Sequence, residues 1–342
     1  MKTSDTRSIG RTGLSTSIMG FGGAPLGNLN AILPDSQSVA TVRRAKACGV
    51  TLFDTAPLYG YGLSEHLVGE ALRWATRDGY VLSTKVGRRL VPDDPANIDG
   101  GLFQRTLPFR PVYDYSYDGT MRAVEDSLQR MALQRIDVLH IHDVDVWTHG
   151  TREAADARFD EAMNGAYKAM IRMRDEGTIK AIGVGVNEAD MCERFARAGD
   201  FDCFLLAGRY TLLEQGALDG LLPLCEERGI GIMLGGPYNS GILATGAKPG
   251  AYYNYHRAPP DIMDRVTRIE AVCRRHGVAL PAAALQFPLG HSCVFSVIPG
   301  AVTPDEIDRN VATMETPIPA DLWVDLKAEG LLREDAPAPA GG

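Results

Sequence analysis

Short apolar runs alternate with longer amphipathic stretches along most of the chain. The apolar runs are rich in Val, Ile, Leu and Phe, which favours strands, whereas the stretches between them place apolar residues at helical spacing. The expected strands are Ile18–Gly22, Thr51–Asp54, Tyr80–Thr84, Ile136–His142, Ala181–Val184, Cys203–Ala207, Gly231–Leu234 and Val294–Pro299. The expected helices are Ser38–Cys48, Ser64–Ala75, Asp118–Met131, Phe159–Glu176, Glu188–Ala198, Gly216–Arg228, Ile262–His276 and Pro304–Met314. Strands alternating with helices predict a parallel sheet, and eight such units favour a closed (β/α)8 TIM barrel over an open doubly wound sheet.

Three connections are too long to be simple links, namely residues 86–117, 143–158 and 235–260. All three follow expected strands, which places them at the C-terminal face, where barrel enzymes keep their active sites. Their aromatic residues predict a packed wall around a substrate: Phe103, Phe109, Tyr113, Tyr115, Trp147, Tyr252, Tyr253 and Tyr255. We expect one barrel domain over residues 1–334, followed by a disordered tail of Ala and Pro over residues 335–342.

Composition and charge exclude several classes of protein. Hydrophobic residues make up 45% and charged residues 23% of the 342 positions, which is ordinary for a globular enzyme. The net charge of −8 argues against nucleic-acid binding, which calls for a basic face. No apolar stretch approaches the roughly 20 residues that span a bilayer, and no signal peptide is recognisable, so we expect a cytoplasmic protein without membrane partners. The six scattered cysteines predict neither disulfides nor a metal site.

Four side chains that carry chemistry lie at or after the ends of expected strands: Asp54, Tyr59, Lys85 and His142. The C-terminal ends of barrel strands converge on one rim, so these residues can meet although they are distant in sequence. An ammonium beside a phenol favours the phenolate and lowers its pKa, a carboxylate holds the lysine, and an imidazole can orient a substrate oxygen. Taken singly, each has an ordinary alternative: a capping Asp, a packing Tyr, a solvated Lys and a structural His.

Longer motifs around these residues resemble the aldo-keto reductase superfamily, and the resemblance covers most of the chain. DTAPLYGYGLSEHLVGEAL matches a highly specific family signature, RIDVLHIHD is similar to the family's fourth strand, and IGRTGLSTSIMGFGGAPLG is similar to its opening β-hairpin and first strand. The resemblance implies that Asp54, Tyr59, Lys85 and His142 form a catalytic tetrad. It also implies a nicotinamide cofactor bound without a Rossmann motif. His140 is interpreted as structural.

The resemblance also suggests where the nicotinamide would bind. AIGVGVNE is similar to the segment that holds the carboxamide, which makes Asn187 the candidate, with a helix N-cap as its alternative role. Gly235 stands where a ring-stacking tyrosine is common, and Tyr210 or Tyr238 could compensate. This pocket therefore departs from the usual pattern of the family.

The segment VIPGAVTPDEIDRN indicates which nicotinamide cofactor is used. Relatives that prefer NADP offer a Lys and an Arg to the 2′-phosphate, and those positions are Gly300 and Glu306 here, with Ala301 beside them. A carboxylate repels a phosphate but accepts hydrogen bonds from a ribose hydroxyl, so we predict NAD. Arg309 and Asn310 are expected to face the adenine, although Arg309 could also reach a phosphate.

Further segments, among them IHDVDVWTHG and AALQFPLGH, are similar to a branch that oxidises cyclic hemiacetals to lactones. We expect an aldose of the L-fucose, L-galactose or D-arabinose type as substrate, bound by Asp143, Trp147 and Tyr238. Pyridoxal is the alternative substrate, because the loop aromatics could form a slot for a pyridine ring. A general aldehyde reductase, or a binding protein like the channel β-subunits of the superfamily, is a further alternative.

Overall fold

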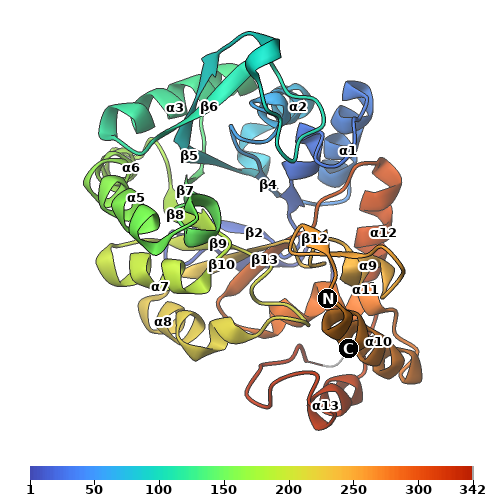
Figure 1. Cartoon of the computed structure of the whole chain (residues 1–342). Helices are drawn as coiled ribbons and strands as arrows, with labels where there is room; N and C mark the ends of the chain where they lie inside the picture. The colour runs from blue at the N-terminus through green and yellow to red at the C-terminus, as the bar shows by residue number, and fades with distance from the viewer. Residues whose placement is uncertain (341–342) are drawn as a thin grey trace.

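The computed structural model describes residues 1–340, and within them eight parallel strands form one closed ring. The strands are β3 (Phe21–Gly22), β4 (Leu52–Asp54), β5 (Val81–Pro92), β7 (Val138–His142), β8 (Ala181–Val186), β9 (Cys203–Ala207), β10 (Gly231–Gly235) and β13 (Val294–Ile298). Each pairs with the next in this order, and parallel bridges from Met19 to Val297 and from Gly22 to Gly300 close the ring. Helices surround the strands (Figure 1). The fold is the predicted (β/α)8 barrel.

The outer helices follow the strands in chain order. They are α1 (Asp35–Ala47), α2 (Leu63–Leu72), α3 (Tyr117–Met131), α5 (Arg152–Asn164), α6 (Ala166–Asp175), α7 (Ala189–Ala198), α8 (Leu221–Arg228), α10 (Pro260–Arg275), α11 (Leu280–Gln286), α12 (Pro304–Met314) and α13 (Ala320–Ala328). Their apolar faces pack on the outside of the barrel in one continuous core. Helices α11 and α13 were not predicted from the sequence.

The inside of the barrel has an apolar floor and a polar upper part. The floor is a separate cluster that includes Leu52, Val81, Val138 and Met233 from the strands. Ile9 joins it from the antiparallel hairpin of β1 (Thr6–Ser8) and β2 (Ser15–Ser17), which lies at the N-terminal end of the chain and confirms the expected opening hairpin. Because the floor is filled with side chains, a ligand can approach the interior only from the C-terminal ends of the strands.

The single helix expected at Phe159–Glu176 is wrong, since the structure has two helices, α5 and α6. They meet at Gly165, where a Cβ atom would lie 2.4 Å from the carbonyl oxygen of Tyr115. The close approach of another backbone segment therefore breaks a pattern that is amphipathic throughout. Because α5 begins at Arg152, the connection after β7 is also shorter than expected.

The long connections contain regular structure of their own. Strand β5 continues to Pro92 and pairs antiparallel with β6 (Phe109–Asp114), which forms a hairpin beside the barrel mouth (Figure 1). The second connection contains the short helix α4 (Val146–His149), and the third contains α9 (Ile242–Thr245) and a hairpin of β11 (Tyr252–Tyr253) and β12 (His256–Arg257). These segments build the rim around the candidate site.

The described part of the expected tail does not behave as a free end. Ala336 is completely buried, and Ala338 packs against the main core, so the expectation of disorder is wrong for this part. Residues 341–342 lie outside the described residues, and the prediction for them is not tested. Over the described chain, no helix combines the length and apolar character needed to cross a membrane.

Candidate active site

A buried ion pair joins Asp54, at the end of β4, to Lys85 on β5. The ammonium of Lys85, on β5, donates to Asp54 Oδ2 at 2.7 Å and to the carbonyl oxygen of Thr55 at 2.8 Å. Ser83 Oγ donates to the other carboxylate oxygen of Asp54 at 2.7 Å. Burial raises the pKa of Asp54, and the Lys85 ammonium opposes this shift. The carboxylate thus has a partner for each oxygen and holds the lysine in one position.

Tyr59 and His142 lie against this pair. Lys85 Nζ is 4.7 Å from the centre of the Tyr59 ring, and the rings of Tyr59 and His142 are 5.9 Å apart at 85°. Tyr59 lies on the loop after β4, and His142 is the last residue of β7. The structure therefore brings together the four residues that the sequence singled out, from three strands and one loop.

The electrostatics of Tyr59 differ from the expectation. Burial raises the pKa of its phenol well above the usual value, and the charges of Asp54 and Asp143 add to this, while Arg88 opposes it. The expected lowering of this pKa by Lys85 is therefore not found, because burial and the two carboxylates outweigh the opposing effect of Arg88. Burial also lowers the pKa of His142 well below its usual value, and Arg88 and Lys85 contribute in the same direction. The imidazole is neutral near pH 7 and carries one N–H.

His140 lies deeper in the barrel than His142. Its Nδ1 is 3.2 Å from Ser83 Oγ, and its Nε2 is 3.7 Å from Cys203 Sγ. Burial lowers its pKa to about 3, so the ring is neutral in the folded protein. These contacts place it beneath the site, where it supports Ser83.

A second buried ion pair, of Arg88 and Asp143, lies beside His142. The sequence had indicated only one of its two members. Arg88 Nη1 is 2.8 Å from Asp143 Oδ2, and Asp143 Oδ1 is 3.5 Å from His142 Nε2. Asp143 was a candidate from the sequence, but Arg88 was not, because residues 86–117 were interpreted as a loop. No local pattern marks Arg88, because the extension of β5 beyond Lys85 depends on its pairing with β6.

The aromatic wall is present in part. Tyr115 is completely buried, and its hydroxyl donates to the carbonyl oxygen of His142 at 2.7 Å. The ring of Phe103 lies 6.3 Å from that of Tyr59. Trp147 packs 6.3 Å from the ring of Tyr255, which is 41% exposed. Trp147, Tyr113 and Tyr252 remain largely exposed at the rim.

Asn187 follows β8 at the rim of the barrel. Its backbone N–H donates to Asp145 Oδ2 at 2.9 Å, and its carbonyl oxygen accepts from Arg209 Nε at 2.8 Å. The alternative role as helix N-cap is wrong, since α7 takes Glu188 as its cap residue. Two backbone contacts therefore fix the position of Asn187 next to the site.

Most of the other cofactor candidates gather where β10 and β13 end and α12 begins. Gly235 ends β10, Gly300 and Ala301 follow β13, and Glu306, Arg309 and Asn310 lie on α12. Tyr238 joins them, because its hydroxyl donates to Asn310 Oδ1 at 3.1 Å.

The side chains in this group are placed by the start of α12. Glu306 Oε2 accepts from the backbone N–H of Val302 at 2.7 Å, while its Oε1 is 3.7 Å from Arg309 Nη2. Arg309 has 66% of its side chain exposed. A carboxylate, an amide, a phenol and an exposed guanidinium suit the hydroxyls and base of a dinucleotide, so this region fits the expected cofactor.

Tyr210 does not belong to this group. It is completely buried, its ring lies 5.3 Å from Phe287 and 5.7 Å from His291, and it packs in the layer outside the barrel. The expectation that it contacts the nicotinamide is therefore wrong. The chain turns after β9 and carries the ring away from the rim.

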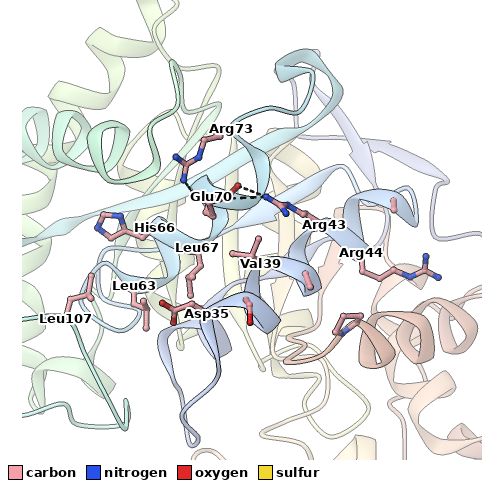
Figure 2. Close-up of a pocket in the computed structure, with 14 residues that line it drawn as sticks. Asp35, Val39, Arg43, Arg44, Leu63, His66, Leu67, Glu70, Arg73 and Leu107 are labelled. Atoms are coloured by element: carbon pink, nitrogen blue, oxygen red, sulfur yellow. Dashed lines mark hydrogen bonds and ion pairs between the residues drawn. The ribbon is translucent and has the colours of Figure 1, made fainter.

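A groove of about 1000 Å³ lies elsewhere. Figure 2 shows it between α1 and α2, with an apolar floor that includes Val39, Leu63 and Leu67 and with charged residues such as Arg43 and Glu70 at its edge. None of its lining residues belongs to the tetrad. This groove is a feature of the outer helical layer and not of the barrel mouth.

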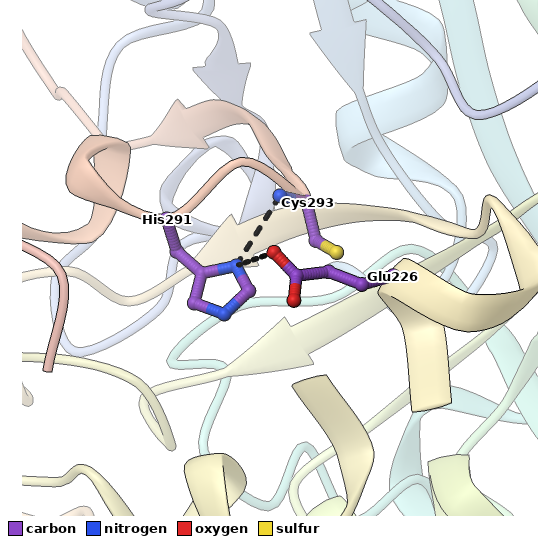
Figure 3. A group of neighbouring side chains, drawn as sticks. All are labelled: Glu226, His291 and Cys293. Atoms are coloured by element: carbon purple, nitrogen blue, oxygen red, sulfur yellow. Dashed lines mark hydrogen bonds and ion pairs between the residues drawn. The ribbon is translucent and has the colours of Figure 1, made fainter. Parts of the chain in front are cut away.

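A possible cation site lies near β13, although none was expected. Ligand atoms of Glu226, His291 and Cys293 lie within 4.8 Å of one another (Figure 3). His291 Nδ1 accepts from the backbone N–H of Cys293 at 3.2 Å, and burial raises the pKa of the Cys293 thiol to about 12. Glu226 is 53% exposed. With a protonated thiol and a nitrogen lone pair already engaged, the group is poorly prepared for a metal. All six cysteines are free thiols.

Comparisons with known proteins agree with the barrel fold. The chain is 40% identical to pyridoxal 4-dehydrogenase of Microbacterium luteolum, over 97% of this chain and 99% of the relative. It is 39% identical to D-threo-aldose 1-dehydrogenase of a Pseudomonas species, over 94% and 96%. Its fold matches an aldo-keto reductase from Bacillus halodurans with a TM-score of 0.74 at 23% identity, over 96% and 97% of the two chains.

The model of the aldo/keto reductase family matches residues 18–328, a span that contains Asp54, Tyr59, Lys85 and His142. Members of this family are oxidoreductases that act on small molecules with a nicotinamide cofactor. The match covers nearly the whole barrel, and the chain therefore belongs to the aldo/keto reductase family.

Proposed function

We propose that the chain is an NAD-dependent dehydrogenase that oxidises the cyclic hemiacetal of an aldose, of the L-fucose, L-galactose or D-arabinose type, to its lactone. The observation that carries this proposal is the contact of the Tyr59 phenol with the buried Lys85–Asp54 pair and His142. The similarity to D-threo-aldose 1-dehydrogenase supports the substrate class.

In this reaction the bound nicotinamide would accept a hydride from the anomeric carbon. Tyr59 removes the proton of the anomeric hydroxyl as general base. Lys85 lies 4.7 Å from the centre of the phenol ring, so that its positive charge is beside the phenolate as it forms, and Asp54 keeps the ammonium in place. His142 is neutral, so it can donate its N–H to the reacting oxygen without competing for the proton.

The preference for NAD rests on the start of α12. Gly300 and Glu306 offer no positive charge to a 2′-phosphate, and the Glu306 carboxylate is fixed by the backbone of Val302. Changing Glu306 to Lys should move the ratio of kcat/KM values from NAD toward NADP. Asp305→Lys, on the neighbouring residue, adds the same charge and should change this ratio much less. An NADP preference in the unchanged enzyme would contradict the proposal.

Pyridoxal is the second candidate substrate. It is favoured by the similarity to pyridoxal 4-dehydrogenase, which extends over 97% of the chain. The ring of Phe103, next to that of Tyr59, could stack on a pyridine ring. The chemistry at Tyr59 would be the same, because pyridoxal also forms a cyclic hemiacetal.

A substrate panel distinguishes these proposals. L-fucose, L-galactose, D-arabinose and pyridoxal are each offered with NAD and with NADP, and formation of the reduced cofactor is followed by absorbance. The highest kcat/KM is expected for an aldose with NAD. Activity on pyridoxal alone would select the second candidate. Activity only on simple aldehydes with NADPH would replace both by a general reductase.

The six free thiols suit a reducing compartment, so we propose a cytoplasmic location.

A further inference from the structure

The ion pair of Arg88 and Asp143 has no role in the proton transfer described above. Arg88 lies on β5 beyond Lys85, and its guanidinium is 2.8 Å from Asp143 and 4.7 Å above the ring of Tyr113. Only 7% of the Arg88 side chain is exposed. A buried ion pair adds little stability, because removing two charges from water offsets most of their attraction. Its place beside the tetrad therefore points to a function in the site.

The backbone holds Asp143 in a costly conformation. Its φ angle is +55°, in the left-handed region that residues other than glycine seldom adopt. Its N–H donates to the carbonyl oxygen of Gly185 at 2.9 Å, and its own carbonyl oxygen lies 3.3 Å from the hydroxyl of Tyr115. Strain of this kind persists at sites where it directs a side chain. Here it directs the carboxylate between Arg88 and His142.

The carboxylate lies next to the position of the reacting oxygen. Asp143 Oδ1 is 3.5 Å from His142 Nε2, the atom that can donate to that oxygen. An acceptor and a donor at this spacing match two oxygens on adjacent carbons of a sugar ring. A carboxylate also binds a hydroxyl more strongly than a neutral acceptor does.

Resting on the proposed function, we propose that Asp143 binds the hydroxyl on the carbon next to the anomeric carbon, and that Arg88 is the residue that positions Asp143. Burial raises the pKa of Asp143 and the charge of Asp145 adds to this shift, while the adjacent guanidinium opposes it and favours the ionised acceptor. The pair thus gives the enzyme a preference for aldoses that carry a 2-hydroxyl.

The first test needs no variant. The best aldose of the panel and its 2-deoxy counterpart, for example L-fucose and 2-deoxy-L-fucose, are compared by kcat/KM with saturating NAD. Loss of a hydrogen bond to a charged group predicts a decrease of about 10- to 100-fold for the 2-deoxy sugar. Equal efficiency on both sugars would overturn this inference and leave the proposed function intact. Failure of every aldose would overturn the proposed function and the inference with it.

Variants then assign the preference to the pair. Asp143→Asn and Arg88→Met should each abolish most of the preference for the 2-hydroxyl, mainly by raising KM for the normal sugar. Activity on both sugars should also fall by a common factor, because the charges of Asp143 and Arg88 act on Tyr59, so the ratio of the two kcat/KM values is the quantity compared. The affinity for NAD should change only a few-fold. Arg88→Lys should restore part of the preference. Arg89→Met is the matched control, since Arg89 is the next residue on β5 and pairs with Asp114 at 3.2 Å instead.

A purely structural role gives a different pattern. If Arg88→Met lowers activity on both sugars by the same factor and keeps the ratio of the unchanged enzyme, the inference is wrong. The ratio of two substrates on one variant is independent of how much of that variant folds, so poor folding cannot hide the result.

Discussion

At the scale of single residues, the phenol of Tyr59 is the group with the most direct part in the proposed reaction. Tyr59→Phe keeps the ring between Lys85 and Phe103 and removes only the hydroxyl. Loss of a general base should reduce kcat by about 10² to 10⁴, while the affinity for NAD stays within about twofold. Reduced-cofactor absorbance measures turnover, and fluorescence titration measures binding.

Tyr61 provides the matched control for this change. Its hydroxyl donates to the carbonyl oxygen of Asp99 at 2.6 Å, away from the tetrad, so Tyr61→Phe should keep most of the turnover. A Tyr59→Phe variant with more than a tenth of the normal kcat would exclude Tyr59 as the base.

The pKa shifts at the site predict how oxidation depends on pH. Tyr59 must lose its proton to act as base, and burial raises its pKa, so kcat/KM should increase with pH across the neutral and alkaline range. The pKa of His142 is lowered, so its protonation should cause no inflection near pH 6.5. The profile is measured with normal and anomerically deuterated sugar, because an isotope effect at every pH shows that hydride transfer is being observed. A plateau that begins near pH 7 would contradict a raised pKa of the phenol.

At the scale of elements, the sequence predicted the barrel well because each strand carries its own signal. The apolar runs ending at Asp54 and His142 mark strands β4 and β7, and the convergence of strand ends then places these residues together. Local pattern could not show that β5 continues to Pro92, since this depends on pairing with β6. Arg88 was missed for that reason.

Other differences also arise from contacts between distant segments. The amphipathic pattern runs unbroken through Gly165, and only the approach of the Tyr115 backbone divides it into α5 and α6. Tyr210 was expected to compensate for the missing ring-stacking tyrosine at Gly235, but the direction of its side chain depends on the turn after β9, which sequence alone does not define.

Gly87 tests how the extension of β5 supports the site. Its φ angle is +103°, and a Cβ atom there would lie 2.2 Å from Cε1 of Tyr115. Gly87→Ala should cost about 3 kcal/mol through backbone strain and overpacking. It should also lower kcat, because Tyr115 holds the carbonyl oxygen of His142. Denaturant unfolding and steady-state kinetics measure the two effects.

The control for Gly87 is a glycine that also has a positive φ angle but has no atom in close contact with the position of a Cβ. Gly177 has a φ angle of +75°, and the nearest atom to its missing Cβ is Lys180 Nζ at 3.9 Å. Gly177→Ala should therefore cost only about 1 kcal/mol, from strain alone, and leave kcat unchanged. Equal losses for the two variants would mean that the contact with Tyr115 is not important.

At the scale of the whole molecule, the barrel is apolar at its floor and densely charged at its mouth. The lower interior is filled by residues such as Leu52 and Phe295, whereas Asp54, Lys85 and Arg88 are buried above them. Such an interior is sensitive to pH, because protonation of a buried group changes the free energy of folding. The two neutral histidines of β7, His140 and His142, contribute to this sensitivity on the acid side.

His140 allows this sensitivity to be measured. Its pKa is about 3 in the folded protein, against about 6.5 in an unfolded chain, so the unfolded state binds the extra proton between these values. The stability that it contributes is complete above pH 6.5 and is lost as pH falls toward 3. Between pH 5.5 and 4.5 the loss should be about 1.4 kcal/mol per pH unit.

Replacing His140 isolates this effect from that of the buried carboxyl groups, which titrate in the opposite sense. Burial raises the pKa of Asp54, for example, so its protonation favours the folded state as pH falls. As pH falls, the unfolding free energy of His140→Gln should decrease by about 1.4 kcal/mol per pH unit less than that of the unchanged protein. This difference in slope does not depend on the stability of the variant at pH 7. His256→Gln, at an exposed position on β12, should leave the slope unchanged. Urea unfolding followed by circular dichroism from pH 4.5 to 7 measures these slopes. An unchanged slope in His140→Gln would mean that this ring is charged in the folded barrel, which its position beneath Lys85 opposes.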